Sequence, residues 1–414
     1  MSLEVFALTI PMTTKRSFLM APLAALGALS GACGPSQLGS AKDSHDMKAE
    51  QIAVYFGSYT EGWSCTAESP CTGGGIYRAT FDSKTGALGE PVLAHESVNP
   101  SYLAVASKGG NRYLYAVNEV GNFGGKPTGA VSAFKIEKDG ALTLLNQLPS
   151  MGADPAHVSV SKSGKFVLVA NYSGGSVASF KIMDDGRLQL ASSVQHSGAT
   201  GPHPNQQAPH AHFIANDDQG QRVFVADLGL DQVLVYALDE ATGALTPNVP
   251  PFANTPPGAG PRHLAFERQG RFVYSNNELA QTVTVFARDA TTQALTPIQT
   301  LSSLLPGDAQ QGQSSEIALS PDGNHLYVGN RGPNSVAVFD VSMPSGQLNL
   351  KATVPTGGNW PRDFKLDPSG RFLVVGNNRS GDVTVFALDV ATGLPSATSF
   401  KVALNQVSNI VFVP

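Results

Sequence analysis

The chain has 414 residues, of which 42% are hydrophobic and only 14% are charged. This length allows two average domains or one large all-β or barrel-like unit. The 43 glycines and 28 prolines indicate many turns. The net charge is −5 and no run of Lys or Arg occurs, so the composition argues against a nucleic-acid partner.

The N-terminal part of the chain is expected to be a targeting signal rather than part of the folded domain. Residues 1–33 contain a Lys-Arg pair, an apolar stretch and small residues before Cys33. The apolar stretch is too short and too broken by Pro and Gly for a membrane span. TKRSFLM is similar to a twin-arginine export signal, and LSGAC is similar to a lipoprotein cleavage box. We therefore expect an exported protein, periplasmic or anchored to the membrane by a lipid on Cys33, with residues 34–50 as a flexible tether.

Two further cysteines, Cys65 and Cys71, lie in one Gly-rich segment, EGWSCTAESPCTGGG. In an oxidising compartment such close cysteines are expected to form a local disulfide. A metal site would be the alternative, but it would need more ligands nearby.

A sequence motif is repeated along the rest of the chain. Similar stretches occur at 110–136, 164–182, 220–238, 270–288, 323–341 and 370–388. Their spacing of roughly 50 residues is typical of propeller blades. Each copy is a pair of β-branched and aromatic runs joined by a Gly/Asn turn, which predicts a hairpin. Inner strands such as PAHVSV precede the hairpins, and outer strands follow turns such as KDGAL, so one unit has four strands.

The last segment, SNIVFV (408–413), supplies the inner strand that the first unit lacks. The sequence therefore predicts an all-β fold over residues 51–414. It is a seven-bladed β-propeller with four antiparallel strands per blade, closed by the C-terminal strand joining the N-terminal blade. Two β-sandwiches would be the alternative, but they would not explain the regular period.

Two polar columns emerge when the repeats are aligned. One residue of each inner strand is polar or phenolic: Tyr102, His157, His212, His263, Glu316, Asp363 and Asn409. A second column ends the next strand: Asn118, Asn171, Asp227, Asn277, Asn330 and Asn377. The first column is expected to ring the central channel, and the second to bond to turn backbone. Because the two strands are antiparallel, both columns lie at the same end, where the long loops also emerge. This end is the predicted ligand mouth.

Several interpretations of the ring remain open at this point. It could solvate a water-filled channel, or His210 and His212 could be half of a metal site. As a catalytic site, Glu316 or His157 would take a proton from water, and Arg262 or Arg331 would face the oxygen that gains charge. The sequence has neither a G-x-S-x-G motif nor a phosphate-binding P-loop. Three histidines outside the column are expected at the surface: His196, His203 and His325.

The motifs NPSYLAV, PAHVSV, VANYSGGSV, PHAHF, GPRHLAF and SPDGNHLYVGNRG together resemble the propeller lactonase family, which includes 6-phosphogluconolactonases and carboxymuconate-cyclising enzymes. The resemblance covers residues 52–414. It implies metal-independent opening or closing of a lactone by His, Arg and Glu side chains in the channel mouth. The matching positions are His157, His210, His212, Asp227, Arg262, His263, Glu278, Glu316 and Arg331.

The chain also departs from the family pattern. Gln206 stands where members usually carry Arg, Asp363 stands where His is usual, and Ala156 replaces a common Cys. An exported member is expected to act on an unphosphorylated lactone, because phosphorylated sugar lactones are cytoplasmic.

The expected function is therefore that of a lactone hydrolase without metal or cofactor, acting on a small lactone. The expected catalytic residues are His157, Arg262, Glu316 and Arg331. The expected substrate-binding residues are Glu119, Gln206, His210, His212, Asp227, His263 and Glu278. The rival hypothesis is a non-catalytic exported propeller that binds a sugar acid or a partner protein. A third hypothesis is calcium-dependent lactonase action, which chelators would abolish.

Overall fold

The computed structural model describes residues 51–413, apart from 63–64, 68 and 309–311. The expected export signal, the tether and Cys33 lie outside the described residues. No helix among the described residues is long and apolar enough to cross a membrane.

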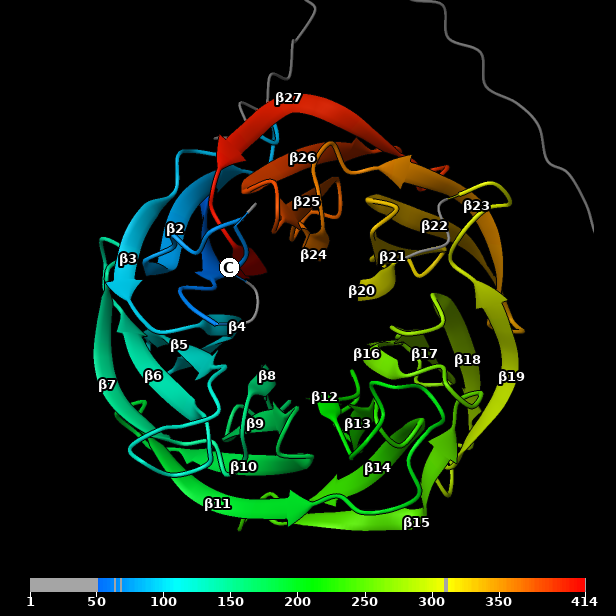
Figure 1. The fold of residues 1–414 in the computed structure, drawn as a ribbon, viewed down its shortest axis with the longest axis horizontal. Helices are drawn as coiled ribbons and strands as arrows, with labels where there is room; N and C mark the ends of the chain where they lie inside the picture. Colours follow the sequence, from blue (N-terminus) through cyan, green and yellow to red (C-terminus); the bar gives the residue numbers. More distant parts are fainter. Residues whose placement is uncertain (1–50, 63–64, 68, 309–311, 414) are drawn as a thin grey trace, which may run out of the picture. The chain divides into compact units, whose positions relative to one another are not determined.

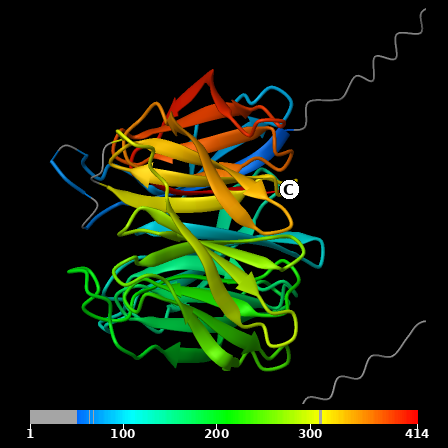
Figure 2. The ribbon, with the colours of Figure 1, turned by 90° about the vertical axis from the view of Figure 1, so that its right-hand side faces the viewer.

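The described residues form 28 strands in seven four-stranded antiparallel sheets, arranged as blades around a ring (Figure 1). This confirms the seven-bladed β-propeller. Figure 2 shows the same ring from the side, with turns and loops at both ends of the blades. Since the inner strands surround the axis, residues far apart in the sequence come together there.

The blades are numbered 1 to 7 in the order in which they occur along the chain. Blade 1 contains β28 (Val407–Val413), β1 (Gln51–Ser58), β2 (Gly75–Asp82) and β3 (Val92–Glu96). Blade 2 contains β4 (Pro100–Lys108), β5 (Asn111–Asn118), β6 (Ala130–Ile136) and β7 (Leu142–Pro149). Blade 3 contains β8 (Pro155–Val160), β9 (Phe166–Asn171), β10 (Ser176–Ile182) and β11 (Leu188–Gln195). Blade 4 contains β12 (Ala211–Asn216), β13 (Val223–Asp227), β14 (Gln232–Leu238) and β15 (Leu245–Asn254).

The remaining blades have the same order. Blade 5 contains β16 (Pro261–Phe266), β17 (Phe272–Asn277), β18 (Thr282–Arg288) and β19 (Leu295–Ser302). Blade 6 contains β20 (Gln313–Leu319), β21 (His325–Arg331), β22 (Ser335–Ser342) and β23 (Gln347–Pro355). Blade 7 contains β24 (Pro361–Leu366), β25 (Phe372–Asn377), β26 (Asp382–Leu388) and β27 (Pro395–Ala403).

The ring is closed by pairing between the two ends of the described chain. β28 pairs antiparallel with β1, with Val411 opposite Tyr55. At the boundary with blade 7, the Phe81 ring packs edge-on against Phe372 and Phe412, at centroid distances of 5.8 and 5.3 Å. Because β28 completes the first sheet, β1 is not left as an exposed edge that could pair with another chain.

Apolar packing between blades explains why the strands are hydrophobic at consecutive positions. Seven clusters of buried apolar side chains are found, each joining two neighbouring blades. In β9, for example, every residue of Phe166–Asn171 is buried. Such strands have apolar neighbours on both faces, as the continuous hydrophobic runs predict.

The Asn/Asp column connects neighbouring segments at the mouth end of the blades. Asn118 Nδ2 donates to the Val98 carbonyl at 2.6 Å, and Asn171 Nδ2 donates to the Ser150 carbonyl at 3.0 Å. Each bond ties the end of the second strand to the linker that precedes the same blade. Asn118 and Asn171 therefore have the structural role that was expected of the column.

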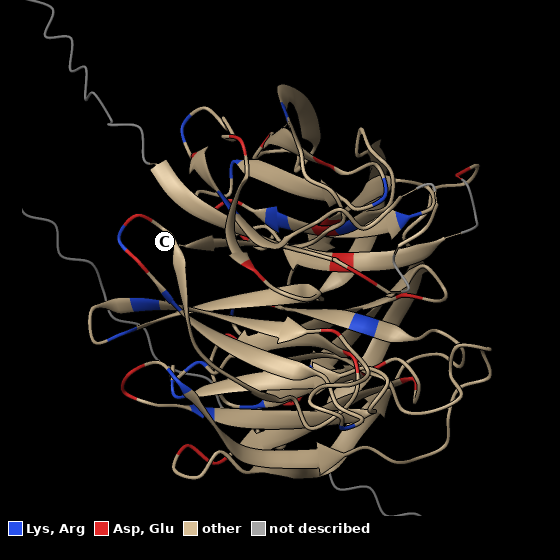
Figure 3. Cartoon of the chain, turned by 60° about the vertical axis from the view of Figure 1, so that its left-hand side comes forward, with Lys and Arg blue, Asp and Glu red and all other residues tan. Residues whose placement is uncertain are grey.

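Charged residues are dispersed over the turns and loops. In the view of Figure 3, the positions of Lys and Arg (blue) and of Asp and Glu (red) are scattered over the strands and loops. Most of the surface ion pairs among the described residues are isolated, such as Lys165–Glu240 at 3.9 Å, and exposed pairs of this kind add little stability. The charges with a stronger structural effect are those buried near the axis.

Candidate functional site

A pocket of about 290 Å³ opens at the mouth end of the channel. Its described lining residues are Glu119, Asp154, Ala156, Tyr172, Ser173, Asn205, His212, Glu278, Gln313, Arg331, Trp360 and Arg362. They come from the ends of second strands, the starts of inner strands, and the loops between blades. We call this cavity the mouth pocket. The packing of seven inner strands around one axis positions it.

Two buried ion pairs at the mouth pocket meet at Glu278. Its Oε2 lies 2.9 Å from Arg262 Nε and 2.9 Å from Arg331 Nη2. Arg331 also donates to the Ser314 carbonyl at 2.8 Å. Burial alone would raise the pKa of Glu278, but the charges of Arg331 and Arg262 lower it below its ordinary value. Burial lowers the pKa of Arg331 to about 10, which leaves its guanidinium charged at neutral pH.

A second cluster of charged and polar side chains, Tyr59, Glu119 and Arg362, lies beside the cluster around Glu278. The Tyr59 hydroxyl donates to Glu119 Oε2 at 2.8 Å and accepts a bond from Arg362. Arg362 Nη2 lies 3.9 Å from the same Glu119 oxygen. Burial raises the pKa of Tyr59 well above its ordinary value, so the phenol stays protonated and remains a donor.

His212 differs from these ion pairs because its imidazole is not engaged by a charged partner. It lines the mouth pocket, and its Nδ1 has no hydrogen-bond partner among the described residues. Its ring lies edge-on to Tyr172 and His263, at centroid distances of 5.5 and 5.1 Å. Burial, followed by the charge of Arg262, lowers the pKa of His212 well below its ordinary value. The imidazole is therefore neutral at physiological pH.

A second layer of charges lies below the mouth pocket. Glu316 Oε2 accepts from His263 Nδ1 at 3.1 Å, from the Tyr102 hydroxyl at 3.3 Å and from Lys365 Nζ at 3.2 Å. Burial alone would raise the pKa of Glu316, but Lys365 and His263 hold it well below its ordinary value. With three donors on one oxygen, Glu316 is a poor proton acceptor.

His157 belongs to the same lower layer. Its ring lies between Tyr102 and Phe213, at centroid distances of 4.2 and 4.4 Å, and Nδ1 accepts a long bond from the Ile214 amide at 3.4 Å. The structure thus brings His157, Arg262 and Glu316 to one end of the axis, as the sequence predicts. However, these three residues are not among those that line the mouth pocket. Among the four expected catalytic residues, only Arg331 is.

Three of the expected substrate-binding residues bond to protein atoms at the pocket edge. Gln206 Nε2 donates to the Leu228 carbonyl and to Asp231 Oδ1, both at 2.7 Å. Asp227 Oδ1 accepts from the His210 amide at 2.7 Å, and Oδ2 lies 2.7 Å from His196 Nδ1. His210 stacks on Tyr172 with centroids 4.5 Å apart. These contacts shape the loop beside His212, and none of the three side chains lines the mouth pocket.

The other expected binding residues fall into two groups. Glu119, His212 and Glu278 line the mouth pocket, whereas His263 lies below it with Nε2 3.2 Å from Arg262 Nη1. The pocket also includes residues that were not among the expected catalytic or binding residues: Asp154, Tyr172, Ser173, Asn205, Gln313, Trp360 and Arg362. Two of them, Asp154 and Trp360, directly precede an inner strand, and this position in the repeat was a signal from which the sequence could have predicted them.

Two histidines expected at the surface are buried instead. His196 is 4% exposed and pairs with Asp227, while His325 is 6% exposed and lies 3.2 Å from Asp340. Each of the two buried rings lies beside a carboxylate. Cys65 and Cys71 are joined by a disulfide with Cα atoms 5.0 Å apart. No group of three or more His, Cys, Asp or Glu within the described ranges has a metal-binding arrangement.

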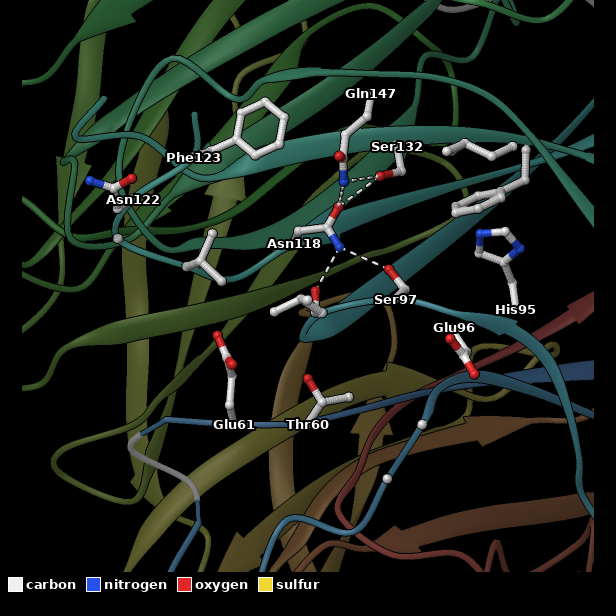
Figure 4. A pocket seen from close by; sticks show the side chains of 17 residues that line it. Thr60, Glu61, His95, Glu96, Ser97, Asn118, Asn122, Phe123, Ser132 and Gln147 are labelled. Atoms are coloured by element: carbon white, nitrogen blue, oxygen red, sulfur yellow. Dashed lines mark hydrogen bonds between the residues drawn. The ribbon is translucent and has the colours of Figure 1, made fainter. Parts of the chain in front are cut away.

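A larger groove of about 820 Å³ lies between the outer parts of blades 1 and 2. Figure 4 shows Asn118 at its centre, bonded to Ser132, Gln147 and Ser97, with His95 to one side. Its described lining residues include two carboxylates but no Arg or Lys. The groove therefore lacks a cation that could stabilise an oxyanion, and we place the candidate active site in the mouth pocket.

The fold and the mouth pocket define a β-propeller with a charged, small-molecule-sized site on its axis. A family model described as "Lactonase, 7-bladed beta-propeller" matches residues 53–412. The chain is 38% identical over 312 residues to a 6-phosphogluconolactonase of Bacillus subtilis, covering 75% of this chain and 83% of that protein.

Solved structures are similar over the whole propeller. A periplasmic gluconolactonase of Pseudomonas aeruginosa is 33% identical with a TM-score of 0.78, covering 88% of this chain and 99% of that one. A putative 6-phosphogluconolactonase of Bacteroides fragilis is also 33% identical with a TM-score of 0.78, covering 88% and 98%. The chain belongs to the seven-bladed β-propeller lactonase family. This confirms the expected resemblance and agrees with the expected enzyme class, a lactonase.

Proposed function

We propose that the protein hydrolyses an unphosphorylated sugar lactone, with a water molecule activated in the mouth pocket. The proposal rests on one observation: His212, whose neutral imidazole has no charged partner, and a fixed cation, Arg331, line the same cavity. Its relatives in the family are named as lactonases that act on gluconolactone or its 6-phosphate.

In the proposed reaction, water attacks the lactone carbonyl carbon while His212 accepts one of its protons. Arg331 donates to the carbonyl oxygen as that oxygen gains negative charge. The bond between the carbonyl carbon and the ring oxygen then breaks, and the ring oxygen takes the proton from His212. The product is an open-chain hydroxy acid, and His212 returns to its neutral form. Compared with Glu316, His212 can accept the proton without losing an existing ion pair.

The charge of the mouth pocket favours a substrate without phosphate. The described lining residues include two arginines, Arg331 and Arg362, but three carboxylates, Glu119, Asp154 and Glu278. With Arg262 behind Glu278 the charges balance, so no cation is left for a phosphate dianion. Gln206 adds no charge where relatives usually carry Arg. Export, as expected from residues 1–33, belongs to the same proposal, because it would place the enzyme outside the cytoplasm.

The test measures opening of δ-gluconolactone and of 6-phosphogluconolactone by purified protein, with the spontaneous rate subtracted. We expect faster opening of the unphosphorylated lactone. The variant His212→Asn should lower kcat by about 10²-fold, the low end of the contribution of a general base. His95→Asn is the matched control, because His95 lies in the groove between blades 1 and 2.

Three other outcomes would contradict the proposal. Faster opening of the phosphorylated lactone would refute the substrate class. No opening of either lactone, together with binding of gluconate, would favour the non-catalytic propeller. Loss of activity in EDTA, restored by calcium, would favour the metal-dependent mechanism.

A further inference from the structure

Trp360 has an unusual backbone for its residue type. It directly precedes the inner strand of blade 7 and has a φ of 65°. Positive φ is uncommon for residues other than Gly and is a clear outlier for bulky side chains. Hydrogen bonds hold this conformation: the Trp360 amide donates to Asn334 Oδ1 at 2.8 Å, and its carbonyl accepts from the Asn378 amide at 3.0 Å.

Three other blades, blades 2, 3 and 5, use residues better suited to the same position. The residues that precede the inner strands of blades 1, 2, 3 and 5 also have positive φ: Gln406, Asn99, Asp154 and Gly260. Gly, Asn and Asp tolerate this region better than a bulky side chain does. A Trp in this backbone conformation therefore costs more conformational energy than an Asn would, and blade 2 carries Asn at the equivalent position. Strain of this kind is found where a side chain serves a function.

The surroundings of the indole indicate what that function is. Trp360 is half-buried and lines the mouth pocket beside Arg331, whose guanidinium carbon lies 5.5 Å from the ring centroid. The exposed Arg379, which does not line the pocket, lies against the ring at 3.4 Å. The part of the half-buried indole that lines the mouth pocket therefore lies next to the cation that we assign to the lactone carbonyl.

We propose that Trp360 is a specificity-determining residue on which the ring of the sugar lactone packs, with its carbonyl directed at Arg331. The C–H groups of a sugar ring offer an apolar face to an aromatic platform, and the polar rim of the pocket contacts the hydroxyl groups. A small lactone without a sugar ring would gain little from the same contact. This inference rests on the function proposed above.

The variant Trp360→Asn separates a binding role from a structural one. Because Asn occupies the same position in blade 2, we expect thermal unfolding at the parent temperature or above it. The KM for δ-gluconolactone should rise roughly tenfold, as for loss of one aromatic contact, while kcat changes less than about threefold. The KM for γ-butyrolactone should not change. Phe123→Asn is the matched control, since Phe123 lines the groove between blades 1 and 2.

Fluorescence gives a second readout that does not require turnover. The sequence contains two tryptophans, Trp63 and Trp360, so the variant Trp63→Phe reports on Trp360 alone. Titration with gluconate, the stable product, should change its emission with the same Kd that calorimetry gives for the unmodified protein. If Trp360→Asn keeps the parent KM and gluconate affinity, this inference is wrong, although the proposed function stands. If neither gluconolactone nor gluconate interacts with the parent protein, both fail.

Discussion

Glu278 of blade 5 and Arg331 of blade 6 face each other across a blade boundary, with 2.9 Å between Oε2 and Nη2. Both side chains are almost fully buried. An arginine in this position depends on its carboxylate, because a buried charge without a partner is costly. The pair therefore links the stability of the ring to the geometry of the mouth pocket.

Removing the carboxylate should affect both properties. For Glu278→Gln we expect a loss of about 3 kcal/mol in the free energy of unfolding, since two arginines lose their buried partner. Activity on the lactone should fall by about 10²-fold because Arg331 is no longer fixed. Urea unfolding and steady-state kinetics measure the two effects. Glu267→Gln, which removes an ion pair to Arg271 away from the mouth pocket, is the control; an equal loss of activity in it would contradict the assignment.

Arg331 itself should contribute mainly to kcat. Replacing it with Met removes the donor to the developing oxyanion, and kcat should fall by about 10²- to 10³-fold. Arg331→Lys keeps the charge but not the planar donor geometry, so only partial recovery is expected. Progress curves at saturating lactone provide the measurement. A kcat within twofold of the parent in the Met variant would exclude Arg331 from this role.

Acid should destabilise the propeller through its buried histidines. Burial lowers the pKa of His263 to about 4, although Glu316 opposes that shift. The unfolded chain has the ordinary value near 6.5, so it binds more protons than the folded protein between the two values. The contribution of His263 to stability should therefore be constant above about pH 6.5 and fall as the pH drops toward 4, by on the order of 3 kcal/mol. Denaturant unfolding at several pH values tests this. His263→Asn should flatten the dependence, and an unchanged slope would contradict it.

The C-terminal strand should be indispensable for folding. Ending the chain before β28 would remove the partner of β1 and expose the apolar cluster between blades 1 and 7. We expect a protein that aggregates or unfolds without a cooperative transition, as judged by calorimetry and gel filtration. Removing only Pro414, which follows β28, is the control. A truncated protein that melted like the parent would show that ring closure is not required.

The sequence alone determined the architecture because the evidence is periodic. Hairpins recurring at roughly 50 residues predict blades, and the stretch 408–413 predicts how the ring closes. It also predicted the side of the molecule that carries the site, since antiparallel pairing places the start of one strand beside the end of the next. The polar ring position from Tyr102 to Asn409 followed from the same alignment.

The tertiary structure alone decided which polar residues meet the pocket and which serve the protein itself. Glu316 and His157 align with His212 in the repeat, but partners from other blades engage Glu316, and aromatic rings enclose His157. Asp227 is one of the positions that match the family and Gln206 precedes the PHAHF motif, yet their side chains bond to neighbouring loops. The repeat specifies a position on a strand. The contacts there come from residues distant in sequence, and those contacts set each group's charge and availability.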